Sequence, residues 1–93
     1  QAVSELLAQS SPLFVLQIQG LTTYQMNLIR CLCQGIHKDF TSKGVLETYQ
    51  LGSKSNISRL KKTLIEKEII EEEGGIITLA DPVFEIWFKK EYM

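Results

Sequence analysis

"LGSKSNISRLKKTLIEKEIIEEEGG", residues 51–75, contains a turn, a basic amphipathic segment, an acidic run and two glycines. Ile57, Leu60 and Leu64 recur at helical spacing, which predicts a helix with one apolar face. This helix is expected to start at Ser53 or Lys54, directly after the glycine of the turn. The stretch therefore begins as a helix that could lie on DNA, and it ends with charges that DNA would repel.

A shorter helix is predicted before the turn, from about residue 43 to residue 49, with Val45, Leu46 and Tyr49 facing inward. Two helices joined by a short turn that contains glycine form a helix-turn-helix. After the second helix, two isoleucine-rich runs at residues 69–71 and 76–79 are joined through a Gly-Gly pair. This arrangement predicts a β-hairpin.

The flanking segments are also expected to be helical. Residues 2–9 show helical spacing of apolar side chains, and Ser11 before Pro12 is a helix-start signal for a second segment that stops at Gly20. Thr22 or Thr23 is expected to cap a central helix that runs to about residue 35. Asp81 before Pro82 opens a last helix.

Together these elements predict a mainly α fold with a small β-hairpin, a winged helix-turn-helix. A chain of 93 residues is long enough for one such domain. We expect residues 21–93 to form the winged-helix domain. Residues 1–20 are expected to be a helical segment that packs on the core or links it to an upstream module.

Within the predicted winged helix-turn-helix, the helix that follows the turn, which starts at Ser53 or Lys54, would present its polar face to a ligand. The candidate contacts to nucleic acid or to a partner are Lys54, Ser55, Ser58, Arg59 and Lys62. Arginine is the commonest side chain that reads guanine in the major groove. Lys61 lies toward the flank of the core face. An exposed helix face with lysine and arginine is also ordinary in proteins that bind nothing, so this face alone leaves both readings open.

The charge balance opposes ordinary DNA binding. Glu71, Glu72 and Glu73 precede the two glycines of the hairpin, and carboxylates near phosphates weaken binding to DNA. The whole chain has a formal net charge of −1 and an isoelectric point of about 5.8. A second candidate surface lies on the last helix. Its aromatic residues Phe84, Trp87 and Phe88 are either buried or form a partner or interdomain patch.

No catalytic, cofactor or metal site is predicted. Cys31 and Cys33 would point to different sides of a helix, so buried reduced thiols are expected rather than a zinc site. His37 is the only histidine, and no nucleophile has a base at a suitable spacing. Residues 52–55, Gly-Ser-Lys-Ser, lack the earlier glycine and the preceding strand of a phosphate loop.

Several features resemble a known family. They are Leu21-Thr22 with Tyr24-Gln25, Tyr49 with Leu51-Gly52-Ser53, Leu64 with Glu66-Lys67 and Ile69-Ile70, and above all Asp81-Pro82-Val83-Phe84 leading to Trp87. Residues 21–90 resemble the C-terminal winged-helix domain of archaeal-type and related bacterial AAA+ (STAND-like) P-loop ATPases. The resemblance implies a parent ATPase whose upstream module binds ATP and Mg²⁺, while this chain holds no nucleotide site.

The resemblance implies a non-catalytic regulatory or interaction module that partners the upstream ATPase module, with DNA contact open. The alternatives are the DNA-binding domain of a transcriptional regulator and a self-association module built on the aromatic patch. The chain begins with Gln1 and shows neither a signal peptide nor a long apolar run. We therefore expect a piece of a longer cytoplasmic protein without a membrane partner. A small whole protein with a trimmed tag is the alternative.

Overall fold

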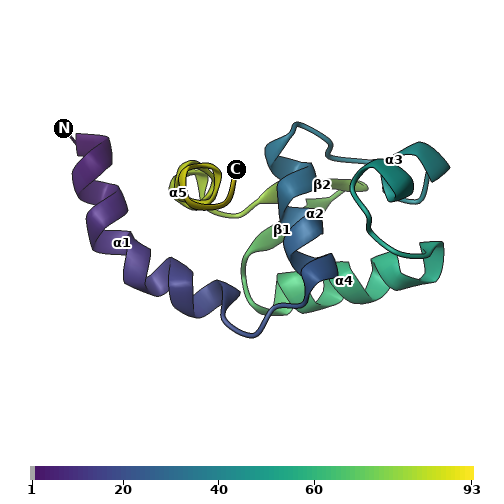
Figure 1. The fold of residues 1–93 in the computed structure, drawn as a ribbon, viewed down its shortest axis with the longest axis horizontal. Helices are drawn as coiled ribbons and strands as arrows, with labels where there is room; N and C mark the ends of the chain where they lie inside the picture. The colour runs from purple at the N-terminus through teal and green to yellow at the C-terminus, as the bar shows by residue number, and fades with distance from the viewer. Residues whose placement is uncertain (1) are drawn as a thin grey trace.

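The computed structural model describes residues 2–93. Figure 1 shows the helix-turn-helix and the hairpin grouped at one end of the molecule, and a long amino-terminal helix at the other end beside the last helix. The elements are α1 (Ala2–Ile18), α2 (Thr23–Cys33), α3 (Lys43–Thr48), α4 (Lys54–Glu66), β1 (Ile70–Glu73), β2 (Ile76–Leu79) and α5 (Pro82–Tyr92). This is the predicted winged helix-turn-helix: α3 and α4 form the helix-turn-helix, and β1 and β2 form the wing.

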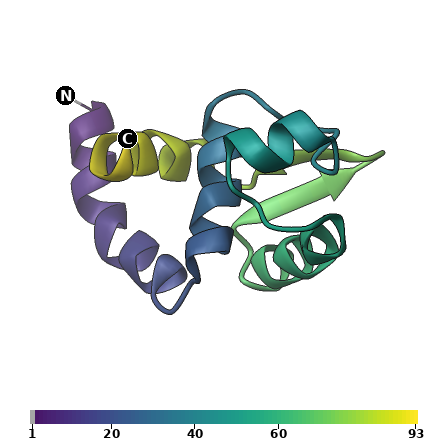
Figure 2. The same cartoon turned by 45° about the vertical axis from the view of Figure 1, so that its right-hand side comes forward.

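Helix α2 is the central helix, as the sequence predicts. Thr22 and Gln25 form a capping box at its start, in which each side chain accepts a hydrogen bond from the other residue's backbone N–H. Leu28, Ile29 and Leu32 are buried, and the helix packs on α4, β2 and α5. Figure 2 shows α2 between α5 on one side and the α3–α4 pair on the other. A helix that is apolar over most of its circumference is buried on several sides.

The turn between α3 and α4 depends on residues with positive φ. Gln50 has a φ of 53° and Gly52 has a φ of 90°. The left-handed region costs a residue with a Cβ about 1–2 kcal/mol, and glycine avoids this cost. A Cβ at Gly52 would also lie 3.0 Å from Nδ2 of Asn56, which donates a hydrogen bond to the Leu51 carbonyl. Gly52 therefore sets the angle at which α4 leaves the turn.

The hairpin is an antiparallel pair in which Ile70 lies opposite Leu79 and Glu73 lies opposite Ile76. Gly74 and Gly75 both have positive φ, as the two-residue turn of a tight hairpin requires. Ile70 and Ile77 are buried against the helices. The free edge of β2 is covered at one point, because the Ile77 N–H donates to the His37 carbonyl at 2.9 Å.

The first two predicted helices are one helix, so the prediction of a new start at Ser11 and Pro12 was wrong. Helix α1 continues through Pro12 to Ile18. A proline inside a helix removes one hydrogen bond and costs about 3 kcal/mol. Tertiary packing offsets this cost, because Phe14 is buried against α5, and Ser11 binds α5 instead of capping a helix.

Helix α5 is held against α1 by an aromatic cluster. Asp81 caps α5 by accepting from the Val83 N–H at 2.8 Å. The Phe14 ring lies 5.2 Å from the Phe84 ring and 5.4 Å from the Trp87 ring, measured between centroids. Trp87 Nε1 donates to Ser11 Oγ at 3.0 Å. The carboxyl-terminal half of α1 therefore packs on the domain.

The aromatic residues Phe84, Trp87 and Phe88 of α5 are buried, which is one of the two alternatives that the sequence leaves open. Phe84, Trp87 and Phe88 are 2%, 3% and 0% exposed. Phe84 and Trp87 pack on Phe14 of α1, and Phe88 is covered as well, so in this structure the three rings do not form an exposed surface for self-association. None of the helices within residues 2–93 has the length and apolar character needed to cross a membrane.

Candidate contact surface on helix α4

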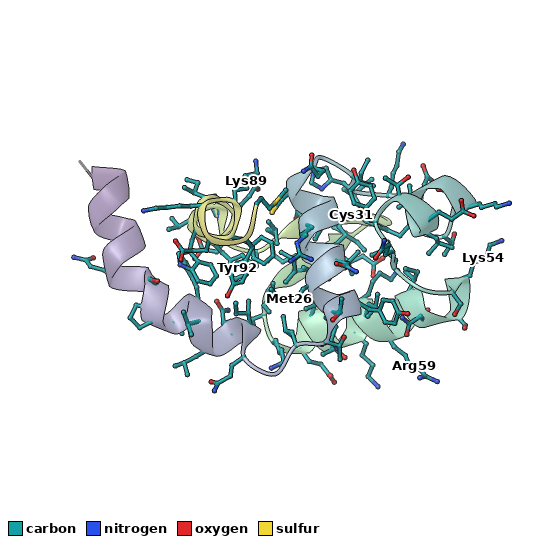
Figure 3. The ribbon with its side chains drawn as sticks, in the orientation of Figure 1. Met26, Cys31, Lys54, Arg59, Lys89 and Tyr92 are labelled. Carbon is teal, nitrogen blue, oxygen red and sulfur yellow. The ribbon has the colours of Figure 1, made fainter. Side chains whose placement is uncertain are left out.

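Helix α4 buries one face and leaves the opposite face open. Ile57, Leu60 and Leu64 are at most 4% exposed. Ser55, Ser58, Arg59 and Lys62 follow the spacing i, i+3, i+4, i+7 and are all exposed, as is Lys54 in the first turn. Figure 3 shows Lys54 at the amino-terminal end of α4 and Arg59 directed away from the body of the domain. The five predicted contact residues thus share one open surface, which we name the α4 face.

The α4 face presents unpaired cations. In the part of the chain that the structure describes, Lys54, Arg59 and Lys62 take part in no salt bridge. Ser55 forms a side-chain hydrogen bond only with the neighbouring Ser53, at 3.0 Å between the two Oγ atoms. The surface therefore carries exposed positive charge and hydroxyl groups.

Asn27 of α2 positions the turn that precedes α4, and sequence reasoning missed it. Its side chain is 8% exposed, and its Nδ2 donates to the Gln50 carbonyl at 2.9 Å. Its Oδ1 accepts from Nη1 of Arg30 at 2.8 Å. The available signal was a single asparagine within the otherwise largely apolar run of α2. Buried polar side chains of this kind are generally hydrogen-bonded, and they fix the elements that they join.

The wing removes one cation from the basic segment. Lys61 Nζ lies 3.0 Å from Oε2 of Glu72, and the two side chains are 28% and 33% exposed. Side chains alternate between the faces of a strand, so Glu72 shares the inner face with the buried Ile77, while Glu71 and Glu73 share the outer face. Residues 53–79 carry five lysines and arginines and five glutamates, so this part of the chain has no net charge.

Two hollows lie beside the α4 face. A notch of about 260 Å³ lies between the start of α2 and the start of α4, and we name it the α2–α4 notch. Its lining residues are Tyr24, Gly52, Ser53, Ser55, Asn56 and Arg59. An open cleft of about 730 Å³ is lined by Lys54 and by residues that follow α2, among them Lys38 and Asp39. Both hollows are lined in part by residues of the α4 face, Ser55 and Arg59 in the notch and Lys54 in the cleft.

The remaining candidates for chemistry are used internally. Cys31 and Cys33 are buried, and burial raises the pKa of each thiol to about 11, with Glu85 adding to the effect at Cys33. The Nδ1 of His37 lies 2.8 Å from the Ile77 carbonyl, which can only accept, so this nitrogen carries the proton. Among the side chains that the structure describes, no three of His, Cys, Asp or Glu are grouped so that they could hold a metal ion.

Comparison with known proteins identifies the fold family. No curated protein and no solved structure matches the chain significantly. One family, described as "Probable winged helix domain", matches residues 13–90, and this range contains about the last third of α1 as well as the helix-turn-helix, the wing and most of α5. The chain belongs to this family of winged helix domains.

Proposed function

We propose that the chain is a non-catalytic contact module that serves a larger P-loop ATPase and acts through the α4 face. The observation that carries this proposal is the contrast between two surfaces. Phe84, Trp87 and Phe88 of α5 are buried in the fold. Lys54, Arg59 and Lys62 of α4 are exposed and form no salt bridge in the described residues. Winged helix domains are generally non-catalytic.

The ATPase part of the proposal rests on the resemblance at Asp81-Pro82 and Trp87. In the structure Asp81 and Pro82 start α5, and Trp87 joins α5 to α1, so the motif maintains the end of the fold that lies away from α4. We expect the parent chain to carry a Gly-x-x-x-x-Gly-Lys-Ser/Thr loop. A parent sequence without this loop would remove the ATPase from the proposal.

The regulatory role is tested in the full-length parent by reversing charge on the α4 face. ATP turnover of an Arg59→Glu, Lys62→Glu variant is compared with that of a Lys89→Glu, Lys90→Glu variant, whose changes lie on α5. We expect the first variant to alter turnover, or its response to the partner, and the second to leave both unchanged. Equal behaviour of the two variants would contradict a contact role for the α4 face.

Duplex DNA is the second candidate ligand, and the spacing of Ser55, Ser58, Arg59 and Lys62 favours it. Recognition helices present side chains from one such face to base edges in the major groove. The Lys61–Glu72 pair also shows that part of the acidic wing is neutralised within the domain. Glu71 and Glu73 remain exposed, so we expect weak binding that requires low salt.

Binding of a fluorescent duplex to the 93-residue domain at low salt tests this candidate. Arg59→Ala and Lys62→Ala should each weaken binding and reduce the dependence of affinity on salt, by about 0.9 in logarithmic slope per lost phosphate contact. Lys90→Ala serves as the control, because it removes the same charge far from α4. A duplex that does not bind even at low salt would remove DNA from the account.

A further inference from the structure

We propose that the α2–α4 notch binds a phosphate group of the duplex DNA backbone, with Tyr24 as a contact that the α4 face alone does not supply. This inference deepens the DNA candidate and rests on it. Tyr24 belongs to the first turn of α2 and is 48% exposed, so about half of its surface is open to a ligand. It lies beside Arg59 and Ser55 in the wall of the notch.

The chemistry of the notch suits an anion. A guanidinium, a phenol, two hydroxyls and an amide line it, and no carboxylate is among the lining residues. Arginine presents its N–H groups in a planar fork that matches a phosphate. The Ser53 and Ser55 hydroxyls share one hydrogen bond, so one of the two hydroxyl hydrogens remains free to donate.

The size of the notch indicates that it would hold one chemical group of a larger ligand and not a whole small molecule. Its volume of about 260 Å³ lies below the roughly 300–1,000 Å³ of pockets that enclose a whole small molecule. Asn56 Nδ2 donates one of its two hydrogens to the Leu51 carbonyl. The donors that line the notch are therefore Tyr24, Arg59, the serine pair and the second N–H of Asn56.

The position of the notch favours a backbone phosphate over other sources of this group. Ser55 and Arg59 belong both to the notch and to the α4 face. A helix that enters the major groove has a phosphate backbone along each side, and phosphate contacts fix the register of the helix in the groove. With α4 in the groove, the notch at the start of α2 would receive a phosphate of the flanking strand.

The test measures duplex affinity and its salt dependence for Tyr24→Phe, with Tyr92→Phe as the control. Tyr92 is a comparably exposed tyrosine on α5, 40% exposed, and lies away from the notch. Tyr24→Phe removes one donor to a charged group, so we expect affinity to fall at least about tenfold. The salt slope should not change, because no charge is lost. Tyr92→Phe should leave both quantities unchanged.

A double variant asks whether the two side chains bind the same phosphate. The loss of affinity in Tyr24→Phe, Arg59→Ala should be smaller than the product of the two single losses, because contacts to one shared group are not additive. The thermal unfolding midpoint of each variant is measured to confirm that it folds. If Tyr24→Phe binds the duplex as tightly as Tyr92→Phe while Arg59→Ala binds more weakly, the notch does not bind a phosphate through Tyr24. That result would overturn this inference without contradicting DNA binding by the α4 face.

Two other outcomes separate this inference from the function on which it rests. If the unmodified domain does not bind the duplex at low salt, both the DNA candidate and the backbone phosphate fail together. If inorganic phosphate, or a phosphoserine peptide, binds more tightly than the duplex and does so through Tyr24, the notch binds phosphate from another source. Either result would overturn the assignment to the DNA backbone.

Discussion

Replacing Asn27 with alanine should destabilise the domain at the turn that places α4. The change removes the hydrogen bond of 2.9 Å that Asn27 Nδ2 donates to the Gln50 carbonyl. It also removes Asn27 Oδ1, which accepts a hydrogen bond of 2.8 Å from Arg30 Nη1. A partly buried group that loses its partner costs about 1–3 kcal/mol. Since water can reach the exposed side of the turn and replace part of the loss, we expect the free energy of unfolding to fall by about 2 kcal/mol.

Urea-induced unfolding measures this change, followed by far-ultraviolet circular dichroism and by the fluorescence of Trp87, the only tryptophan. Gln34→Ala is the matched control, because Gln34 is an exposed amide that follows the last turn of the same helix. A surface change of this kind should stay within about 0.5 kcal/mol. If Asn27→Ala behaves like Gln34→Ala, the asparagine does not hold the turn, and the reasoning is refuted.

Three further predictions concern the core, the wing and the thiols. Phe14→Ala should lower the free energy of unfolding by about 3–5 kcal/mol and shift the tryptophan emission to the red, because it opens a cavity between α1 and α5; unchanged emission would contradict the aromatic contact. Glu72→Gln should change the free energy of unfolding by less than about 1 kcal/mol, because its ion pair with Lys61 is partly exposed. The same change should strengthen duplex binding, because it frees the Lys61 cation, and unchanged duplex affinity would contradict this expectation. Burial raises the pKa of Cys31 and Cys33 to about 11. As pH rises, the unfolded chain therefore loses these protons before the folded chain does, and the free energy of unfolding should decrease between about pH 9 and pH 11. A Cys31→Ala, Cys33→Ala variant should not show this decrease, and the same pH dependence in both proteins would exclude the thiols as its cause.

The elements could be predicted from sequence wherever the signal is local. Thr22 and Asp81 cap helices as expected, and Gly52 and Gly74-Gly75 occupy the turns that require positive φ. These signals act over a few residues, so no knowledge of distant packing is needed. The apolar spacing of Ile57, Leu60 and Leu64 likewise predicts the buried face of α4, and with it the open face.

The features that could not be predicted from the sequence depend on contacts between residues that are distant in the chain. Pro12 continues a helix because Phe14 and Ser11 meet α5, more than 60 residues away in the sequence. The same contact buries the aromatic residues of α5. For the candidate site, the pairing of Lys61 with Glu72 and the link from Asn27 to Gln50 need a folded arrangement before they can be recognised. The notch is of this kind as well, because Tyr24 and Arg59 come together only when α2 packs on α4.

The role of the α4 face is tested most directly by mapping a ligand on the domain residue by residue. In a nuclear magnetic resonance titration of the ¹⁵N-labelled domain with duplex DNA at low salt, the account predicts that the largest backbone amide shifts fall within residues 53–62 and near Tyr24. Shifts in α1 and α5 should be small, because these helices form the opposite end of the molecule in Figure 1. Duplex binding with its largest shifts in α1 or α5 would contradict the account.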